Sequence, residues 1–286
     1  MSDLQARNPT MCITVDFDAT SFWFMVGSTD AHGISRGDYG AEVGTPRLLD
    51  LFERLGIPTT WFIPGHTIDN YRSACERVRD AGHEIGHHGY LHENFVALSR
   101  DQARVAIQKG SQAIERLTGS PPSGFRVTGD FKQELYLTLA EAGLTYTSAL
   151  FGEHYARWAR SPDTFGEDGA ITRGGPLDLV ELPLNVNMTD FRYFEISLSP
   201  ALPAALVNPR HVEEVWRDEF DYACEHAPAA YTMMALHPQS IGWGGRMLML
   251  ERFLRYCQSK PGIRFVDAQT LASEFRSSEE GAATNG

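Results

Sequence analysis

Short apolar runs alternate with amphipathic segments along most of the chain. The apolar runs are rich in β-branched and aromatic residues, which is typical of buried strands. Strands are expected at residues 11–17, 59–63, 83–87, 124–127, 145–149, 178–184, 230–236 and 263–266. Helices are expected near residues 45–55, 67–81, 100–117, 131–143, 210–226, 243–258 and 268–276. This alternation predicts an α/β fold, a single distorted, TIM-like (β/α) barrel of seven to eight strands.

Local signals support this assignment. Thr45 and Pro46 are typical of an N-cap and a first helical position, and Gly56 of a helix end. Ser99 and Gln102 have the spacing of a capping box. The main rival, an open doubly wound sheet, is weakened because no G-x-G-x-x-G turn follows the first expected strand.

The domain organisation follows from the segments that lack a regular pattern. Residues 1–10 are expected to form an N-terminal extension, residues 11–276 the barrel domain and residues 277–286 a disordered tail. Inside the domain, residues 19–42 are expected to form a long loop, and residues 150–177 to be irregular.

Charge and composition exclude several classes of function. The formal net charge is −12 and no Lys/Arg cluster is present, so neither nucleic acid nor an anionic membrane is an expected partner. The polar segment 1–10 lacks the apolar core of a secretory signal, which predicts a cytoplasmic protein. The four cysteines form no C-x-x-C pair and are expected to be reduced.

The expected strands end in residues whose side chains can carry chemistry. The carboxyl ends of barrel strands converge on one face, where catalytic groups collect. The residues at or just after these ends are Asp16, Asp18, His66, His87, His88, His92, Arg126 and His237. We therefore expect a functional site at this face.

Two pairs of these residues have the spacing of metal ligands. Asp16 and Asp18 lie two apart on a strand, so their side chains point the same way. His88 and His92 lie four apart, as on one side of a helical turn. One carboxylate and two imidazoles suit a catalytic divalent ion, and the spare carboxylate can act as a general base. Taken singly, each residue is better explained as a loop or turn cap; taken together, they favour a hydrolase site.

Four stretches also resemble the motifs of a known family. Residues 15–18, 86–92, 124–126 and 236–238 are similar to motifs of the polysaccharide deacetylases of the NodB-homology type, carbohydrate esterase family 4. Residues 40–47, 60–66 and 82–86 resemble an intracellular branch. That branch contains cyclic imide hydrolases, a metal-independent type of allantoinase and peptidoglycan-deacetylase-like proteins. The resemblance extends over residues 11–275.

The resemblance implies a role for each matching residue. One divalent ion, zinc before cobalt, nickel or manganese, would be held by Asp18, His88 and His92. Asp16 would be the general base, and Arg126 would hold it in its ionised form. His237 would protonate the leaving nitrogen. A metal-independent enzyme remains an alternative, because the branch contains one.

The chain departs from the family pattern at two motifs. The third motif lacks the proline expected after Arg126, and Asp190 matches the fourth only loosely. Asp190 is a candidate to contact substrate or to orient His237, with a loop cap as the alternative. His66 and Trp23 are further candidates for substrate binding. For His66 the alternative is a loop-stabilising role. The aromatic run 22–24, which contains Trp23, is expected in a lid, a pocket wall or the interface of a homo-oligomer more than in plain core.

Three functions agree with these features. The first is a metal-dependent hydrolase of carbon–nitrogen, non-peptide bonds in a small cytosolic cyclic imide or amide. The second is an N-deacetylase of amino sugars or peptidoglycan, which uses the same chemistry in a more open groove. The third is a catalytically silent binding module, which we rank last because the residues for catalysis are all present.

Overall fold

The computed structural model describes residues 9–152, 155–195, 207–227 and 230–284. Nearly all of the expected N-terminal extension lies outside these residues. Within the described part of the chain, no helix combines the length and apolarity that a membrane crossing requires.

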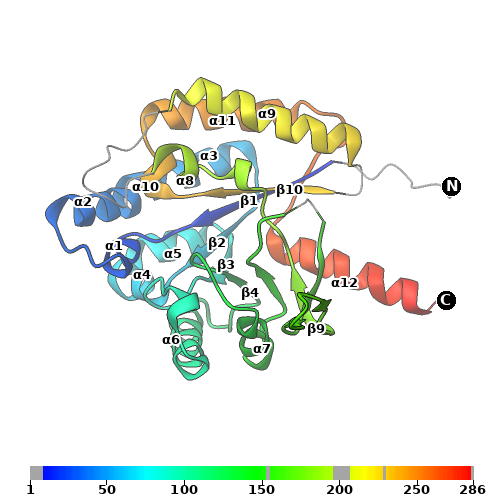
Figure 1. Cartoon of the computed structure of the whole chain (residues 1–286). Helices are drawn as coiled ribbons and strands as arrows, with labels where there is room; N and C mark the ends of the chain where they lie inside the picture. The colour runs from blue at the N-terminus through cyan, green and yellow to red at the C-terminus, as the bar shows by residue number, and fades with distance from the viewer. Residues whose placement is uncertain (1–8, 153–154, 196–206, 228–229, 285–286) are drawn as a thin grey trace.

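The centre of the molecule is a mostly parallel sheet that curves into a distorted barrel (Figure 1). Its parallel strands, in spatial order, are β10 (Tyr231–Leu236), β1 (Thr10–Asp16), β2 (Thr59–Ile63), β3 (Glu84–His87), β4 (Gly124–Arg126), β5 (Tyr146–Ser148) and β9 (Pro176–Glu181). The short strand β11 (Arg264–Phe265) also pairs with β1, and β6 (Arg157–Arg160) runs antiparallel to β9. A bridge between Thr189 and Ala235 joins the segment after β9 to β10. The predicted α/β barrel is thus confirmed, although a loop, and not a pair of strands, closes it between β9 and β10.

Helices cover the outside of the barrel (Figure 1). The longer ones are α3 (Thr45–Leu55), α5 (Arg72–Asp80), α6 (Arg100–Thr118), α7 (Glu134–Glu141), α9 (Pro209–His226), α11 (Gly244–Gln258) and α12 (Ala268–Thr284). One apolar cluster joins the outer face of the sheet to α3, α9 and α11, with Trp216 and Phe253 fully buried in it. A second cluster, around Phe62 and Met233, includes Leu271 and Ala272 of α12. Packing on both faces of the strands explains why they read as continuous apolar runs.

Several local predictions are confirmed and others are wrong. The capping box at Ser99 and Gln102 forms, and Gly56 ends α3 in the left-handed conformation. Thr45 does not cap a helix, because its backbone is already helical and its hydroxyl donates to the carbonyl of Gly40. The helix expected at 67–81 is two helices, α4 (Gly65–Asn70) and α5, which meet at Tyr71.

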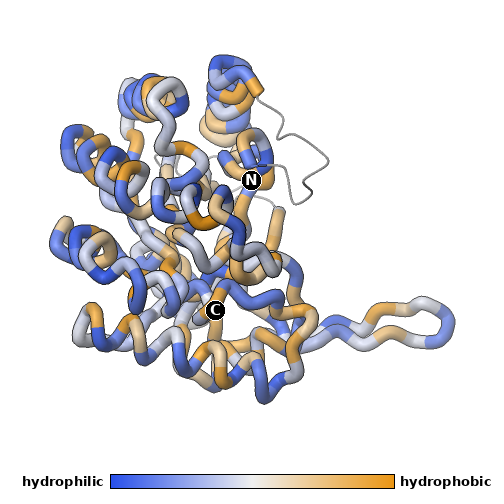
Figure 2. The backbone as a smooth tube through the Cα atoms, turned by 90° about the vertical axis from the view of Figure 1, so that its left-hand side faces the viewer, coloured by the Kyte–Doolittle hydropathy of each residue, from blue (hydrophilic) through white to orange (hydrophobic). Residues whose placement is uncertain are grey.

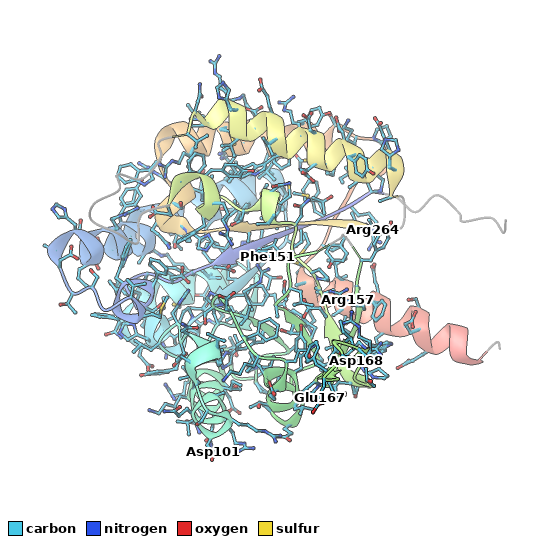
Figure 3. All side chains as sticks on the ribbon, in the orientation of Figure 1. Asp101, Phe151, Arg157, Glu167, Asp168 and Arg264 are labelled. Carbon is cyan, nitrogen blue, oxygen red and sulfur yellow. The ribbon has the colours of Figure 1, made fainter. Side chains whose placement is uncertain are left out.

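The expected loop at 19–42 contains α1 (Ser21–Met25), α2 (Ala31–Tyr39) and the start of a π-helix, η1 (Gly40–Gly44), that leads into α3. The expected irregular segment holds β6 and a hairpin of β7 (Thr164–Phe165) and β8 (Ile171–Thr172). Figure 2 shows this hairpin extending from the body, and Figure 3 labels Glu167 and Asp168 at its turn. The disordered tail expected at residues 277–286 is wrong for residues 277–284, because α12 continues to Thr284.

Candidate metal and hydrolase site

A cavity of about 380 Å³ opens at the carboxyl ends of the strands. It is lined by the six residues for which the sequence predicts chemistry: Asp16, Asp18, His88, His92, Arg126 and His237. They come from strands β1, β3, β4 and β10 or from the residues that follow these strands. The barrel therefore brings together segments that lie far apart in the sequence.

The expected ligand residues form a compact, buried group. Asp18 Oδ1 lies 3.5 Å from His88 Nε2 and 3.6 Å from His92 Nε2. One possible ligand atom from each of the three residues lies within 4.8 Å of the others. The two histidines are not on a helical turn, as their spacing indicated. They lie on an irregular loop in which His92 has a left-handed backbone, with φ of 58°.

The donor chemistry of this group fits a divalent cation. His88 Nδ1 donates to the carbonyl oxygen of Arg126 at 2.8 Å, which leaves a lone pair on Nε2. Burial lowers the pKa of His88 to about 4 and that of His92 well below its usual range, so both rings are neutral. Burial also raises the pKa of Asp18 to about 7.

The orphaned atoms in this group support the same conclusion. Within the described residues, the buried Asp18 Oδ1 has no hydrogen-bond partner. It faces two imidazole nitrogens that can offer lone pairs. A cation among the three atoms would satisfy all of them, and one carboxylate with two imidazoles is a known set for zinc.

The spare carboxylate, Asp16, lies between two cationic side chains. Its Oδ2 is 3.8 Å from Arg126 Nη1 and 3.7 Å from His237 Nε2. Arg126 is anchored by a 3.0 Å hydrogen bond to the hydroxyl of Thr14 and lies over the ring of Phe62. Asp16, which lines the cavity, thus lies close to two cationic side chains.

His237 is held by Asp190 on its other side. Its Nδ1 donates to Asp190 Oδ1 at 2.7 Å, and its backbone nitrogen donates to Asp190 Oδ2 at 2.9 Å. Burial lowers the pKa of this imidazole, but Asp190, Asp16 and Asp18 together raise it to about 9. The ring therefore carries a proton that it can give up inside the cavity.

Three residues expected to bind substrate do not face the cavity. Asp190 is fully buried and both of its oxygens are used by His237, so it orients that ring. His66 packs its ring against Phe24, with centroids 5.3 Å apart, and Trp23 is 7% exposed. Neither is among the residues that line the cavity.

Other side chains line the cavity, and apart from Phe22 they were not identified from the sequence. The cavity wall includes Phe22, Met25, Phe151, Phe191 and Arg192, and Figure 3 labels Phe151. Phe22 immediately precedes Trp23 in the sequence, but a one-residue step around a helix turns the side chain to another face. The run of aromatic residues at 22–24 was the feature of the sequence that indicated an aromatic cavity wall here.

The fold and the site together define a hydrolase of the (β/α)-barrel class. The family model for polysaccharide deacetylase matches residues 37–147. The chain is 31% identical to the peptidoglycan deacetylase of Helicobacter pylori, over 94% of this chain and 97% of the relative. It is 28% identical to the peptidoglycan deacetylase-like protein FGM2 of Gibberella zeae, over 94% of this chain and 87% of that protein.

Solved structures agree with this assignment. A structure from Mycobacterium smegmatis described as a polysaccharide deacetylase superposes with a TM-score of 0.83 at 25% identity, over 98% of this chain and 94% of that chain. The structure of Puue allantoinase shares the fold, with a TM-score of 0.77 at 19% identity, over 96% of this chain and 92% of that chain. The chain belongs to the polysaccharide deacetylase family. It is a hydrolase of carbon–nitrogen bonds other than peptide bonds, from a family whose deacetylases depend on a metal.

Proposed function

We propose that the protein is a metal-dependent N-deacetylase that releases acetate from an N-acetylated amino sugar or peptidoglycan fragment. The sequence favoured a small cyclic imide as substrate and gave the deacetylase as the alternative. We now rank the deacetylase first, because the relatives similar over nearly the whole chain are a peptidoglycan deacetylase and a peptidoglycan deacetylase-like protein. The observation that carries the proposal is the Asp18–His88–His92 group beside a separate carboxylate and a cationic imidazole.

In this proposal Asp18, His88 and His92 hold one divalent ion, with zinc as the first choice for such ligands. When bound, the ion would polarise the acetamide carbonyl and make a water molecule easier to deprotonate. All three residues line the cavity, so an ion held by them would be accessible to a substrate there.

Asp16 is proposed as the general base. It is not needed as a ligand, and its Oδ1 has no hydrogen-bond partner within the described residues. It can therefore accept the proton of the attacking water. Arg126 is proposed to keep the carboxylate in place and charged, since its guanidinium lies 3.8 Å away.

His237 is proposed as the general acid. With Nδ1 engaged by Asp190, its protonated Nε2 points toward Asp16 and the cavity. There it can protonate the sugar nitrogen as the carbon–nitrogen bond breaks, so that acetate and a free amine leave. The acid and the base lie side by side, which matches two proton transfers at one carbonyl centre.

A small cyclic amide is the second candidate substrate. Phe22 and Met25 of α1, together with Phe191, give one part of the cavity an apolar wall. Such a wall suits a compact ring better than a long polar chain. Asp16, His237 and the ligand residues would then hydrolyse the amide bond of the ring.

Acetate release tests the proposal directly. Purified protein, stripped with a chelator and reloaded with zinc, cobalt, nickel or manganese, is assayed on N-acetylglucosamine oligomers and peptidoglycan fragments. A parallel panel contains succinimide, phthalimide, hydantoin and allantoin. We expect metal-dependent acetate release, abolished in Asp16→Asn while the bound metal is retained. Activity on the cyclic amides alone would contradict the deacetylase, and full activity of the stripped protein would contradict the metal site.

A further inference from the structure

Asp18 offers only one of its two carboxylate oxygens to the group of possible ligands. Its Oδ1 faces the two imidazoles, at 3.5 Å from His88 and 3.6 Å from His92. Its Oδ2 accepts a hydrogen bond from the side-chain amide of Gln239, at 3.2 Å. The two oxygens of this carboxylate therefore have different surroundings.

Gln239 is a buried residue that lies next to Asp18. It lies two residues after His237 on the short helix α10 (Pro238–Ile241), and only 2% of its surface is exposed. It does not line the cavity, so it is placed to reach Asp18 and not substrate. Its effect on chemistry must therefore pass through the carboxylate.

The backbone that carries Gln239 is held by the π-helix η1. A Cβ atom on Gly44 would lie 2.2 Å from the carbonyl oxygen of Pro238, and one on Gly40 would lie 3.1 Å from the backbone nitrogen of Gln239. At Gly44, no residue with a Cβ atom fits without a shift of the backbone. The stretch at 40–47, singled out in the sequence, thus provides the support against which α10 rests.

We propose that Gln239 is a positioning residue that restricts Asp18 to ligation through one oxygen. A carboxylate can bind a cation through one oxygen or both, and a hydrogen bond to one oxygen favours the first mode. An amide donor is neutral, so it orients Asp18 without neutralising the charge that attracts the ion. The inference rests on the metal site of the proposed function.

Metal binding in solution tests this role without any assay of activity. The variant Gln239→Met keeps the length of the side chain and removes the donor. Gln239→Asn keeps an amide one methylene shorter and serves if the first variant fails to fold. Ser240→Ala is the matched control, because Ser240 is buried on the same helix and its hydroxyl makes no hydrogen bond within the described residues. Asp18→Ala reports loss of the ligand itself.

Zinc affinity is measured by competition with a chromophoric chelator, and coordination by the visible spectrum of the cobalt-loaded protein. We expect zinc to bind roughly 10- to 100-fold more weakly to Gln239→Met, as for other partners of metal ligands. We also expect weaker visible cobalt bands, because a second oxygen raises the coordination number. The melting temperature of the metal-free variant should stay close to that of the parent protein, and Ser240→Ala should bind zinc within about twofold of it.

The two proposals fail in different ways. Unchanged zinc affinity and an unchanged cobalt spectrum in Gln239→Met or, failing that, Gln239→Asn, with affinity lost in Asp18→Ala, would overturn the role of Gln239 alone. Unchanged affinity in Asp18→Ala as well would overturn the metal site. Equal losses in Ser240→Ala and the Gln239 variants would show a general disturbance of α10 and would also contradict the proposed role.

Discussion

The imidazole of His237 combines burial with a positive charge. Burial opposes the charge, but Asp190, Asp16 and Asp18 overcome it and raise the pKa of His237 to about 9. The largest favourable contribution comes from Asp190, which also accepts the Nδ1 proton at 2.7 Å. Since the proposed general acid must be protonated, Asp190 would determine the pH range in which His237 acts.

The variant Asp190→Asn tests this dependence. Because the pKa of His237 is about 9, deacetylation should fall as the pH rises above that value. Without the negative charge, burial lowers this pKa, and we expect the alkaline limb of kcat/KM to move down by roughly 1–3 pH units. The measurement is the pH profile of kcat/KM, with zinc content as the control. An alkaline limb at the same pH in both proteins would contradict the assignment.

The residues proposed for catalysis and metal binding could be predicted from the sequence more fully than the residues of the cavity wall. Asp16, Asp18 and His237 could be placed together because each lies where a strand ends, and strand ends converge in a barrel. Gln239 escaped prediction, since its contact with Asp18 depends on the packing of the short helix α10. Trp23 was predicted to contact substrate, but its neighbour Phe22 lines the cavity, because sequence alone does not determine the register of α1.

At the scale of elements, η1 and α10 form one close contact. The Cβ that alanine would add at Gly44 falls 2.2 Å from a backbone oxygen, which cannot rotate away as a side chain can. We expect Gly44→Ala to lower the free energy of unfolding by about 1–3 kcal/mol, as overpacking does. Activity should fall as well, because a shift of α10 moves both His237 and Gln239.

Gly245→Ala is the control for this prediction. Gly245 lies in the first turn of α11, where an added Cβ meets nothing within 4 Å. Alanine there should leave stability unchanged or raise it by up to about 1 kcal/mol. Urea unfolding and acetate release are measured on both variants. Equal stability of the two would show that the contact between η1 and α10 tolerates a side chain.

The elements differed in how far the sequence could predict them. Strands such as β1 and β10 were located within about two residues, because burial on both faces makes them continuous apolar runs. The helices α1 and α2 were missed, since 19–42 is rich in glycine and serine and lacks a clear apolar face. The closing bridge between Thr189 and Ala235 joins segments far apart in the chain, so no local pattern indicates it.

At the scale of the whole molecule, a buried acid links the stability of the barrel to pH. Glu181, at the end of β9, is 1% exposed. Its carboxylate accepts from the backbone nitrogens of Ala149 and Leu150 and from the hydroxyl of Tyr136. Burial raises the pKa of Glu181 to about 7. This acid thus ties the loop after β5, part of the cavity wall, to β9 and α7.

The sign of the resulting pH dependence follows from the raised pKa. The folded protein binds the proton of Glu181 more tightly than the unfolded chain, where the pKa is near 4.5. The stability that the protonated acid contributes is therefore complete below about pH 4.5 and is lost as the pH rises through about 7. Glu181→Gln mimics the protonated acid and should escape this loss. Its free energy of unfolding should match that of the parent protein near pH 5 and exceed it by up to about 3 kcal/mol at pH 8. Urea unfolding of both proteins at pH 5 and pH 8 measures the difference in their free energy of unfolding. The other titrating groups are the same in both proteins, so their contributions largely cancel. A difference that stays constant between pH 5 and 8 would contradict the raised pKa of Glu181.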